Sequence, residues 1–171
     1  MELTDMIKRS NALKIGEFTL ASGKKSRYYV DKYIFETSPE ILKKIVEEIT
    51  LKTTEEYDKI AGIELGGVPL ATALSLSTGK PFLIIRKKEK DYGTRALIEG
   101  LMVKGDNILI VEDVTTTGNT LIHGLDIIEQ IGGIIKEIFI VVDREEGAID
   151  RLKDLGYNNI RVLVRLNELL I

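Results

Sequence analysis

The chain has 171 residues, 30% of them charged, and its 24 basic and 27 acidic side chains leave a net charge of −3. This length suits one domain with a buried core, and the acidic balance argues against a protein that coats nucleic acid. The absence of cysteine excludes disulfides and thiolate chemistry, and the one histidine, His123, is too few for a histidine-rich metal site. We find no secretory signal and no apolar run long enough to span a membrane, so we expect a cytoplasmic protein.

The N-terminal segment predicts two helices and a hairpin. Residues 3–12 have the apolar spacing of a short amphipathic helix. Residues 18–31 are typical of a hairpin with arms at 18–20 and 28–30. Ser38 is a suitable cap and Pro39 a suitable first residue for a helix, and apolar residues then recur at helical spacing up to Ile49.

From residue 59 onward, short apolar strands alternate with helices. Strands are predicted at residues 59–63, 81–85, 107–111, 138–142 and 160–164. Helices are predicted at residues 68–77, 118–130 and 148–155, and a charged loop at 87–99. This order predicts an α/β fold, with a parallel sheet covered by helices on both faces. In such folds ligands bind beyond the carboxyl ends of the strands.

The strongest chemical signal lies at residues 108–120. An aliphatic strand leads to the adjacent carboxylates Glu112 and Asp113, then to a hydroxyl-rich turn, then to a helix. A helix start offers free N–H groups and the positive end of a dipole, which suit a phosphate, and Gly118 allows close backbone approach. The turn lacks the Gly-Lys-Ser/Thr ending of a triphosphate loop. The turn and helix start consist of Thr115, Thr116, Thr117, Gly118, Asn119 and Thr120.

The two carboxylates would repel a phosphate, so they must serve another part of the ligand. Adjacent acids that accept hydrogen bonds suit the two hydroxyls of a ribose. Taken piece by piece, these residues also fit an ordinary strand end with a threonine-rich helix cap. The order of strand, acid pair, threonine turn and helix favours a ribose 5-phosphate site.

Two further segments follow predicted strands and suit a second phosphate group. Leu65, Gly66 and Gly67 come after the strand at 59–63, and glycines permit close approach of the backbone to an anion. Basic residues predominate after the strand at 81–85, where cations can stabilise a leaving pyrophosphate. Alone, the first segment also fits a plain strand-to-helix turn, and the second a solvated loop. The basic residues are Arg86, Lys87, Lys88, Lys90 and Arg95.

Arg144 follows the predicted strand at 138–142. An arginine at this place can form a bidentate pair with a planar carboxylate. The alternative is a salt bridge within the protein, to Asp143 or Glu145.

Together these segments resemble the orotate phosphoribosyltransferases of the type I phosphoribosyltransferase family. Residues 108–120 resemble the motif that binds phosphoribosyl diphosphate (PRPP), residues 18–29 the N-terminal hairpin, and residues 86–93 the mobile basic loop. The resemblance covers about residues 12–165. It implies one domain over residues 1–171, with a type I phosphoribosyltransferase-like parallel sheet flanked by helices. A small hood, mainly residues 1–37, would contain the β-hairpin.

The resemblance also implies the reaction: orotate and PRPP give orotidine 5′-monophosphate and pyrophosphate, in de novo pyrimidine (UMP) biosynthesis. It implies Mg²⁺, for which we assign no protein ligand, and a homodimer with shared active sites. It implies catalytic roles for Lys87, Lys90 and Asp113. The implied substrate-binding residues are Lys24, Leu65, Gly66, Arg86, Lys87, Lys90, Tyr92, Glu112, Asp113, Thr115, Thr116, Thr117, Gly118, Asn119, Thr120 and Arg144.

The chain departs from the family pattern at two positions. Many members carry a lysine where this chain has Ala21, and Lys24 or Lys25 could replace it; a histidine is common where this chain has Tyr92. Two other functions stay open: a phosphoribosyltransferase for another base, and a regulator that senses PRPP or a nucleotide. Arg144 and the hairpin argue against the first, and the basic loop argues against the second. His123 is predicted to be a structural or surface residue rather than a catalytic one.

Overall fold

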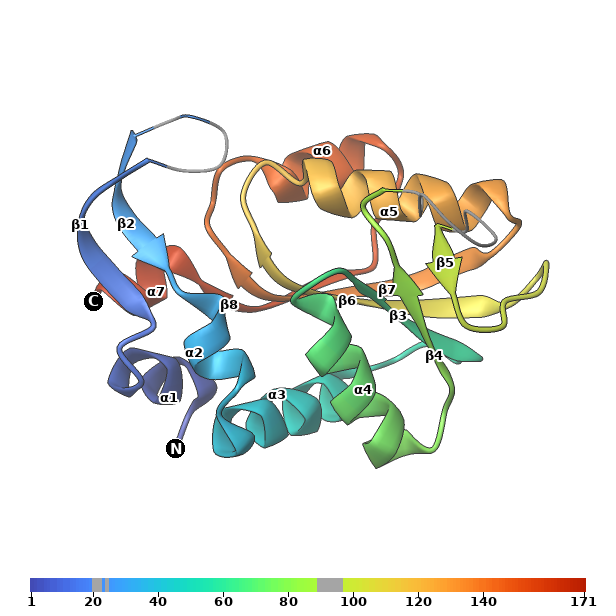
Figure 1. Cartoon of the computed structure of the whole chain (residues 1–171), viewed down its shortest axis with the longest axis horizontal. Helices are drawn as coiled ribbons and strands as arrows, with labels where there is room; N and C mark the ends of the chain where they lie inside the picture. Colours follow the sequence, from blue (N-terminus) through green and yellow to red (C-terminus); the bar gives the residue numbers. More distant parts are fainter. Residues whose placement is uncertain (20–22, 24, 89–96) are drawn as a thin grey trace.

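The computed structural model describes residues 1–19, 23, 25–88 and 97–171 and places them in a six-stranded sheet and a two-stranded hairpin flanked by helices (Figure 1). The main sheet has the order β5-β4-β3-β6-β7-β8. Its strands are β3 (Lys59–Ile63), β4 (Phe82–Ile85), β5 (Ile98–Glu99), β6 (Asn107–Thr115), β7 (Ile134–Asp143) and β8 (Ile160–Arg165). All neighbours are parallel except the β4–β5 pair, which is antiparallel. The predicted α/β architecture is confirmed.

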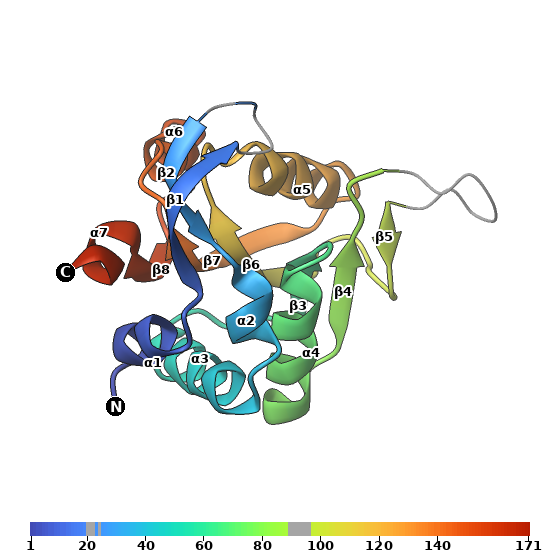
Figure 2. The same cartoon turned by 60° about the vertical axis from the view of Figure 1, so that its left-hand side comes forward.

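Helices cover both faces of this sheet. On one face lie α1 (Leu3–Arg9), α3 (Pro39–Lys52) and α4 (Gly67–Thr78), and on the other α5 (Asn119–Gln130) and α6 (Ala148–Asp154) (Figures 1 and 2). The central strand β6 supplies both cores, since Leu109 and Val111 face the α3–α4 side and Ile108 and Ile110 the α5 side. Successive residues of a strand point to opposite faces, so this alternation continues into the acid pair that follows.

The N-terminal segment forms the hairpin β1 (Leu13–Thr19) and β2 (Lys25–Val30), followed by α2 (Lys32–Glu36). The hairpin lies at one side of the main sheet and leads directly into α2 (Figure 2). Helix α1 packs against α3 and against α7 (Leu166–Leu170) at the other end of the chain. None of the described helices is long and apolar enough to cross a membrane.

The N-terminal elements differ from their predicted bounds. The first arm of the hairpin begins at Leu13 rather than at residue 18, because Leu13 pairs with Val30 and Ile15 with Tyr28. The first helix ends at residue 9 instead of 12. Pro39 opens α3 as predicted and Ser38 occupies the capping position, but the Ser38 side chain makes no capping hydrogen bond.

Strand β6 runs on to Thr115 instead of ending at Val111. Beyond Val111 it keeps its pairing with β7, where Glu112 lies opposite Ile140 and Val114 opposite Val142. The acid pair therefore lies within the strand, held by the sheet. The sequence does not predict α2, β5 or α7, because a helix of five residues or a strand of two is too short to show a period.

Candidate active site

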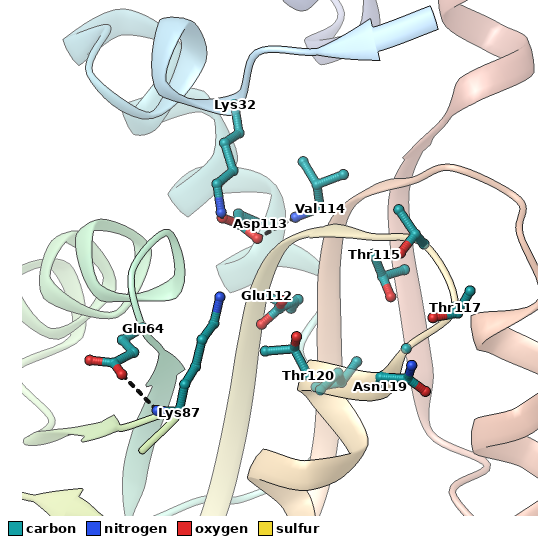
Figure 3. Close-up of a pocket in the computed structure, with 13 residues that line it drawn as sticks. Lys32, Glu64, Lys87, Glu112, Asp113, Val114, Thr115, Thr117, Asn119 and Thr120 are labelled. Atoms are coloured by element: carbon teal, nitrogen blue, oxygen red, sulfur yellow. Dashed lines mark hydrogen bonds and ion pairs between the residues drawn. The ribbon is translucent and has the colours of Figure 1, made fainter. Parts of the chain in front are cut away.

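A pocket of about 320 Å³ lies where β6 ends and α5 begins (Figure 3). It brings together the predicted acid pair, the whole threonine turn and Lys87, and adds Lys32 and Glu64. The lining residues are Lys32, Glu64, Lys87, Glu112, Asp113, Val114, Thr115, Thr116, Thr117, Gly118, Asn119, Thr120 and Leu121.

The turn between β6 and α5 is held from outside by α6. Gly118 caps α5 with a left-handed φ of 81°, and a side chain there would meet Ala148, whose Cβ is 3.2 Å from the position of an added Cβ. Arg151 of α6 donates to the carbonyl oxygen of Thr117 at 2.5 Å and to Asn119 Oδ1 at 2.7 Å. The first turn of α5, whose N–H groups have no partners within the helix, thus lines the pocket, an arrangement suited to a phosphate.

Asp113 is buried and paired with a cation. Lys32 Nζ lies 2.5 Å from Asp113 Oδ2, and the backbone N–H of Val114 donates to Oδ1 at 2.5 Å. Burial works against the positive charge of Lys32, but the adjacent Asp113 outweighs it, so the pKa of Lys32 is raised. This ion pair joins the start of α2 to β6 beside the pocket (Figure 3).

Glu112 is buried on the opposite face of β6 and lacks such a partner. Its Oε2 has no hydrogen-bond partner within the described part of the chain. Burial, and then the nearby Asp113, raises the pKa of Glu112 well above its ordinary value. The side chain of Lys87 extends toward it in Figure 3, while the backbone N–H of Lys87 donates to Glu64 Oε1 at 2.7 Å. A buried polar atom without a partner is suited to a hydroxyl group of a ligand.

The loop from Glu64 to Gly66 borders the pocket. The Glu64–Leu65 peptide bond is cis. Gly66 packs against the acid site so closely that an added Cβ would lie 1.5 Å from Asp113 Oδ2. Glu64 lines the pocket, whereas the lining includes neither Leu65, whose residue surface is 60% exposed, nor Gly66.

Arg144 lies apart from this pocket, beneath the hairpin. It is 7% exposed, and its Nη2 lies 3.1 Å from Ser26 Oγ and 3.0 Å from Glu146 Oε1. The alternative of a salt bridge within the protein is thus present in the structure, but its partner is Glu146 rather than Asp143 or Glu145. Arg144 Nε has no hydrogen-bond partner among the residues that the structure describes.

Comparisons with known proteins decide the family. Residues 35–161 match the family model of the phosphoribosyl transferase domain. Over 159 residues the chain is 50% identical to an orotate phosphoribosyltransferase of Pyrococcus abyssi, which covers 91% of this chain and 87% of that protein. The chain belongs to the orotate phosphoribosyltransferase family. The predicted resemblance is confirmed, and the chain is a phosphoribosyltransferase enzyme.

Solved structures agree with this family. A Leishmania donovani UMP synthase superposes with a TM-score of 0.85 and 31% identity over 98% of this chain, which spans 36% of that longer protein. A Mycobacterium tuberculosis orotate phosphoribosyltransferase in complex with PRPP superposes with a TM-score of 0.80 and 29% identity, covering 99% of this chain and 97% of that one. The type I phosphoribosyltransferase fold is confirmed.

Several residues implied by the family resemblance are not among the pocket residues or lie outside the described part of the chain. Lys24, Lys90 and Tyr92 lie outside the described residues. Arg86 faces β5 and is not part of the pocket lining, since its Nη1 lies 3.9 Å from Glu99 Oε1. His123 is exposed on α5 and does not line the pocket.

Sequence reasoning missed two charged residues of the pocket, Lys32 and Glu64, and of these Lys32 contacts Asp113. Neither lysine weighed as a replacement at Ala21 is seen at the pocket: Lys24 is outside the described part, and Lys25 is exposed on β2. Lys32 enters from α2 and contacts a residue 81 positions away in sequence. The only signal for it was a lysine directly after the hairpin, in the run from Tyr28 to Lys32.

Proposed function

We propose that the chain transfers the 5-phosphoribosyl group of PRPP to orotate, giving orotidine 5′-monophosphate and pyrophosphate in de novo UMP biosynthesis. One observation carries the proposal: a buried acid pair runs directly into a threonine turn at the start of α5, within one pocket. Relatives of this chain are named orotate phosphoribosyltransferases, and one was solved with PRPP.

Each part of PRPP, the 5-phosphate, the ribose and the diphosphate, has suitable residues in or beside the pocket. The 5-phosphate would accept hydrogen bonds from the threonine turn and the first N–H groups of α5. Glu112 and Asp113 would receive the ribose hydroxyls, with Glu112 Oε2 gaining the partner it lacks. The diphosphate would then extend toward Lys87 and the loop that holds Leu65 and Gly66.

The reaction breaks the bond between C1 of the ribose and the pyrophosphate oxygen and forms a bond from C1 to a ring nitrogen of orotate. Orotate can attack as an anion, so the chain need not supply a general base. The developing negative charge on pyrophosphate would be stabilised by Lys87 and Lys90, and Asp113 would fix the ribose as positive charge builds on it. The closed site would exclude water, which otherwise competes as the nucleophile.

Orotate recognition is assigned to Arg144. The residue is nearly buried beside the hairpin, and Nε is without a partner in the described structure. A planar carboxylate could take the place of Glu146 and also accept from Nε, forming a bidentate pair.

Mg²⁺ is part of the proposal as an ion carried by the substrate. The described residues contain no group of three or more His, Cys, Asp or Glu side chains placed to hold a metal. A Mg²⁺ that keeps several waters and binds the oxygens of the diphosphate needs few ligands from the protein. When bound, the ion neutralises charge on the leaving pyrophosphate.

A homodimer is also proposed, in which the basic loop of one subunit closes over the site of the other. The support is the family resemblance and the charge of residues 86–95. Mixing two inactive variants, Lys90→Ala and Asp113→Asn, tests it, because a heterodimer would contain one site with both defects and one with neither. Activity should return toward half of the wild-type value per heterodimer, whereas an inactive mixture with proven subunit exchange would place the loop in cis. A cytoplasmic location belongs to the same proposal.

Loss of orotate absorbance in the presence of purified protein, PRPP and Mg²⁺ tests the function. We expect turnover that requires both PRPP and orotate. Consumption of uracil or a purine in place of orotate would indicate a transferase for another base. Binding of PRPP without turnover of any base would indicate a regulator.

A further inference from the structure

Glu36, the last residue of α2, is a buried acid that the proposed mechanism does not use. It is 2% exposed. Neither of its carboxyl oxygens has a hydrogen-bond partner among the residues that the structure describes. A buried carboxyl group without a donor is costly, so its surroundings must supply an explanation.

Those surroundings are the acid site itself. A Cβ added to Gly66 would lie 1.5 Å from Asp113 Oδ2 and 2.7 Å from Glu36 Oε1, so both oxygens converge on the same glycine. Lys32 Nζ contacts the same Asp113 oxygen at 2.5 Å. Glu36 and Asp113 therefore lie in one cluster of two carboxyl groups and one ammonium group, in which Asp113 and Lys32 line the pocket and Glu36 does not.

Two facing carboxylates can only accept hydrogen bonds, so they cannot satisfy one another unless one of them carries a proton. Burial, and then Asp113, raises the pKa of Glu36 to about 8, while Lys32 acts in the opposite direction. The other charged groups acting here are Asp31, which precedes α2, and Glu112 on β6. The proton therefore belongs on Glu36 at neutral pH, and Asp113 remains the charged partner of Lys32.

We propose that Glu36 is a positioning residue for the PRPP site: its protonated carboxyl group donates a hydrogen bond to Asp113 and, together with Lys32, holds that carboxylate in the orientation that receives the ribose. The proposal rests on the proposed function, because PRPP is the ligand whose ribose Asp113 receives. It adds a residue from the N-terminal segment that touches neither substrate.

Loss of the proton should weaken the site. An ionised Glu36 would place a second negative charge against Asp113, so Asp113 would turn toward Lys32 and away from the ribose. The added charge would also repel the anionic PRPP. Glu36→Gln keeps the shape and a neutral donor at every pH, so it should remove this pH dependence without removing the hydrogen bond.

The test compares the KM for PRPP of the wild type and Glu36→Gln from about pH 6.5 to about pH 9.5. The ratio of wild type to variant cancels the ionisation of the substrates. It should be near one at the acidic end and rise to about tenfold at the basic end, with little change in the ratio of kcat. Glu40→Gln, an exposed glutamate on α3, should follow the wild type throughout. A ratio that stays constant within about twofold would overturn the proposal.

A second readout does not depend on turnover. In the ligand-free protein, a glutamate carboxyl resonance followed by NMR should titrate near pH 8 and be missing from Glu36→Gln. Titration of Glu36 at its ordinary pKa would contradict the shared proton. If the wild type turned over no PRPP with orotate, the proposed function would fail while this titration still decided the state of Glu36.

Discussion

Glu112 and Asp113 are neighbours in the chain but occupy different environments on the two faces of β6. Asp113 has a lysine at 2.5 Å, a backbone donor from Val114 and the carboxyl group of Glu36 close by. Glu112 is enclosed on the α5 side, has an oxygen without a partner in the described structure, and has a raised pKa. The comparison shows that two adjacent acids of one motif can have different electrostatic surroundings, because alternate faces of a strand meet different neighbours.

The largest expected effect comes from Gly66→Ala, which would displace the Asp113 carboxylate or the loop packed against it. The new methyl group would lie 1.5 Å from Asp113 Oδ2, so the loop or the carboxylate must move. We expect kcat/KM for PRPP to fall about 100-fold or more, because misplacing a positioning group by even about 1 Å has an effect of this size. Steady-state kinetics measures it, with circular dichroism to check folding. Gly16→Ala on β1, where an added Cβ would meet only the Phe18 ring at 3.3 Å, is the matched control. A variant within threefold of wild type would contradict the account.

Arg144→Ala tests whether orotate binds at a different place from the ribose of PRPP, which the acid pair is proposed to receive. Loss of a charged hydrogen bond should cost about 1.5–3 kcal/mol, equivalent to a rise of about 10- to 150-fold in the KM for orotate, with a much smaller change for PRPP. Arg144→Lys should restore little, because an ammonium group cannot form the bidentate pair. Equal changes in the two KM values would instead make Arg144 a scaffold residue that joins Ser26 and Glu146.

The smallest effects concern stability without ligand, where the two acids should respond with opposite signs. Asp113→Asn removes the partner of the partly buried Lys32 and should destabilise the protein by about 1–2 kcal/mol at pH 8. Glu112→Gln should stabilise it at the same pH. Because the folded pKa of Glu112 is raised, the wild type loses stability as pH rises above the unfolded glutamate value, and the amide removes this loss.

Urea unfolding at pH 5 and pH 8 measures both variants. The stabilisation by Glu112→Gln should be smaller at pH 5, where an unfolded glutamate is already partly protonated. If both variants destabilised the protein equally at pH 8, the proposed difference between the surroundings of Glu112 and Asp113 would be wrong.

Much of the fold and part of the site could be predicted from the sequence. The strand at 107–111, the threonine turn and the apolar period of 118–130 are local patterns, and the structure places them as β6 and α5. Gly118 stands out in the sequence because glycine allows the backbone to approach an anion closely, and the structure shows in addition a left-handed φ of 81° there. The continuation of β6 to Thr115 was not, because pairing with β7 overrides the polar character of Glu112 and Asp113.

The rest of the site depends on contacts between distant residues. Lys32 and Glu36 lie on a five-residue helix with no period to reveal it, and both meet Asp113 only through the tertiary fold. Nothing in the local sequence distinguishes the buried Glu36 from the exposed Glu40 nearby. The geometry of the Glu64–Gly66 loop depends in the same way on the carboxyl groups packed against Gly66.

The most direct test of the account is the affinity of PRPP for Asp113→Asn, measured by titration calorimetry in the presence of Mg²⁺. The variant keeps the size of the side chain but loses the charge that receives the ribose and pairs with Lys32. We expect its Kd to rise at least about tenfold, equivalent to about 1.4 kcal/mol. Asp126→Asn, an exposed aspartate on α5, should bind within about twofold of the wild type. Wild-type affinity in Asp113→Asn would contradict the central claim that the end of β6 holds the ribose of PRPP.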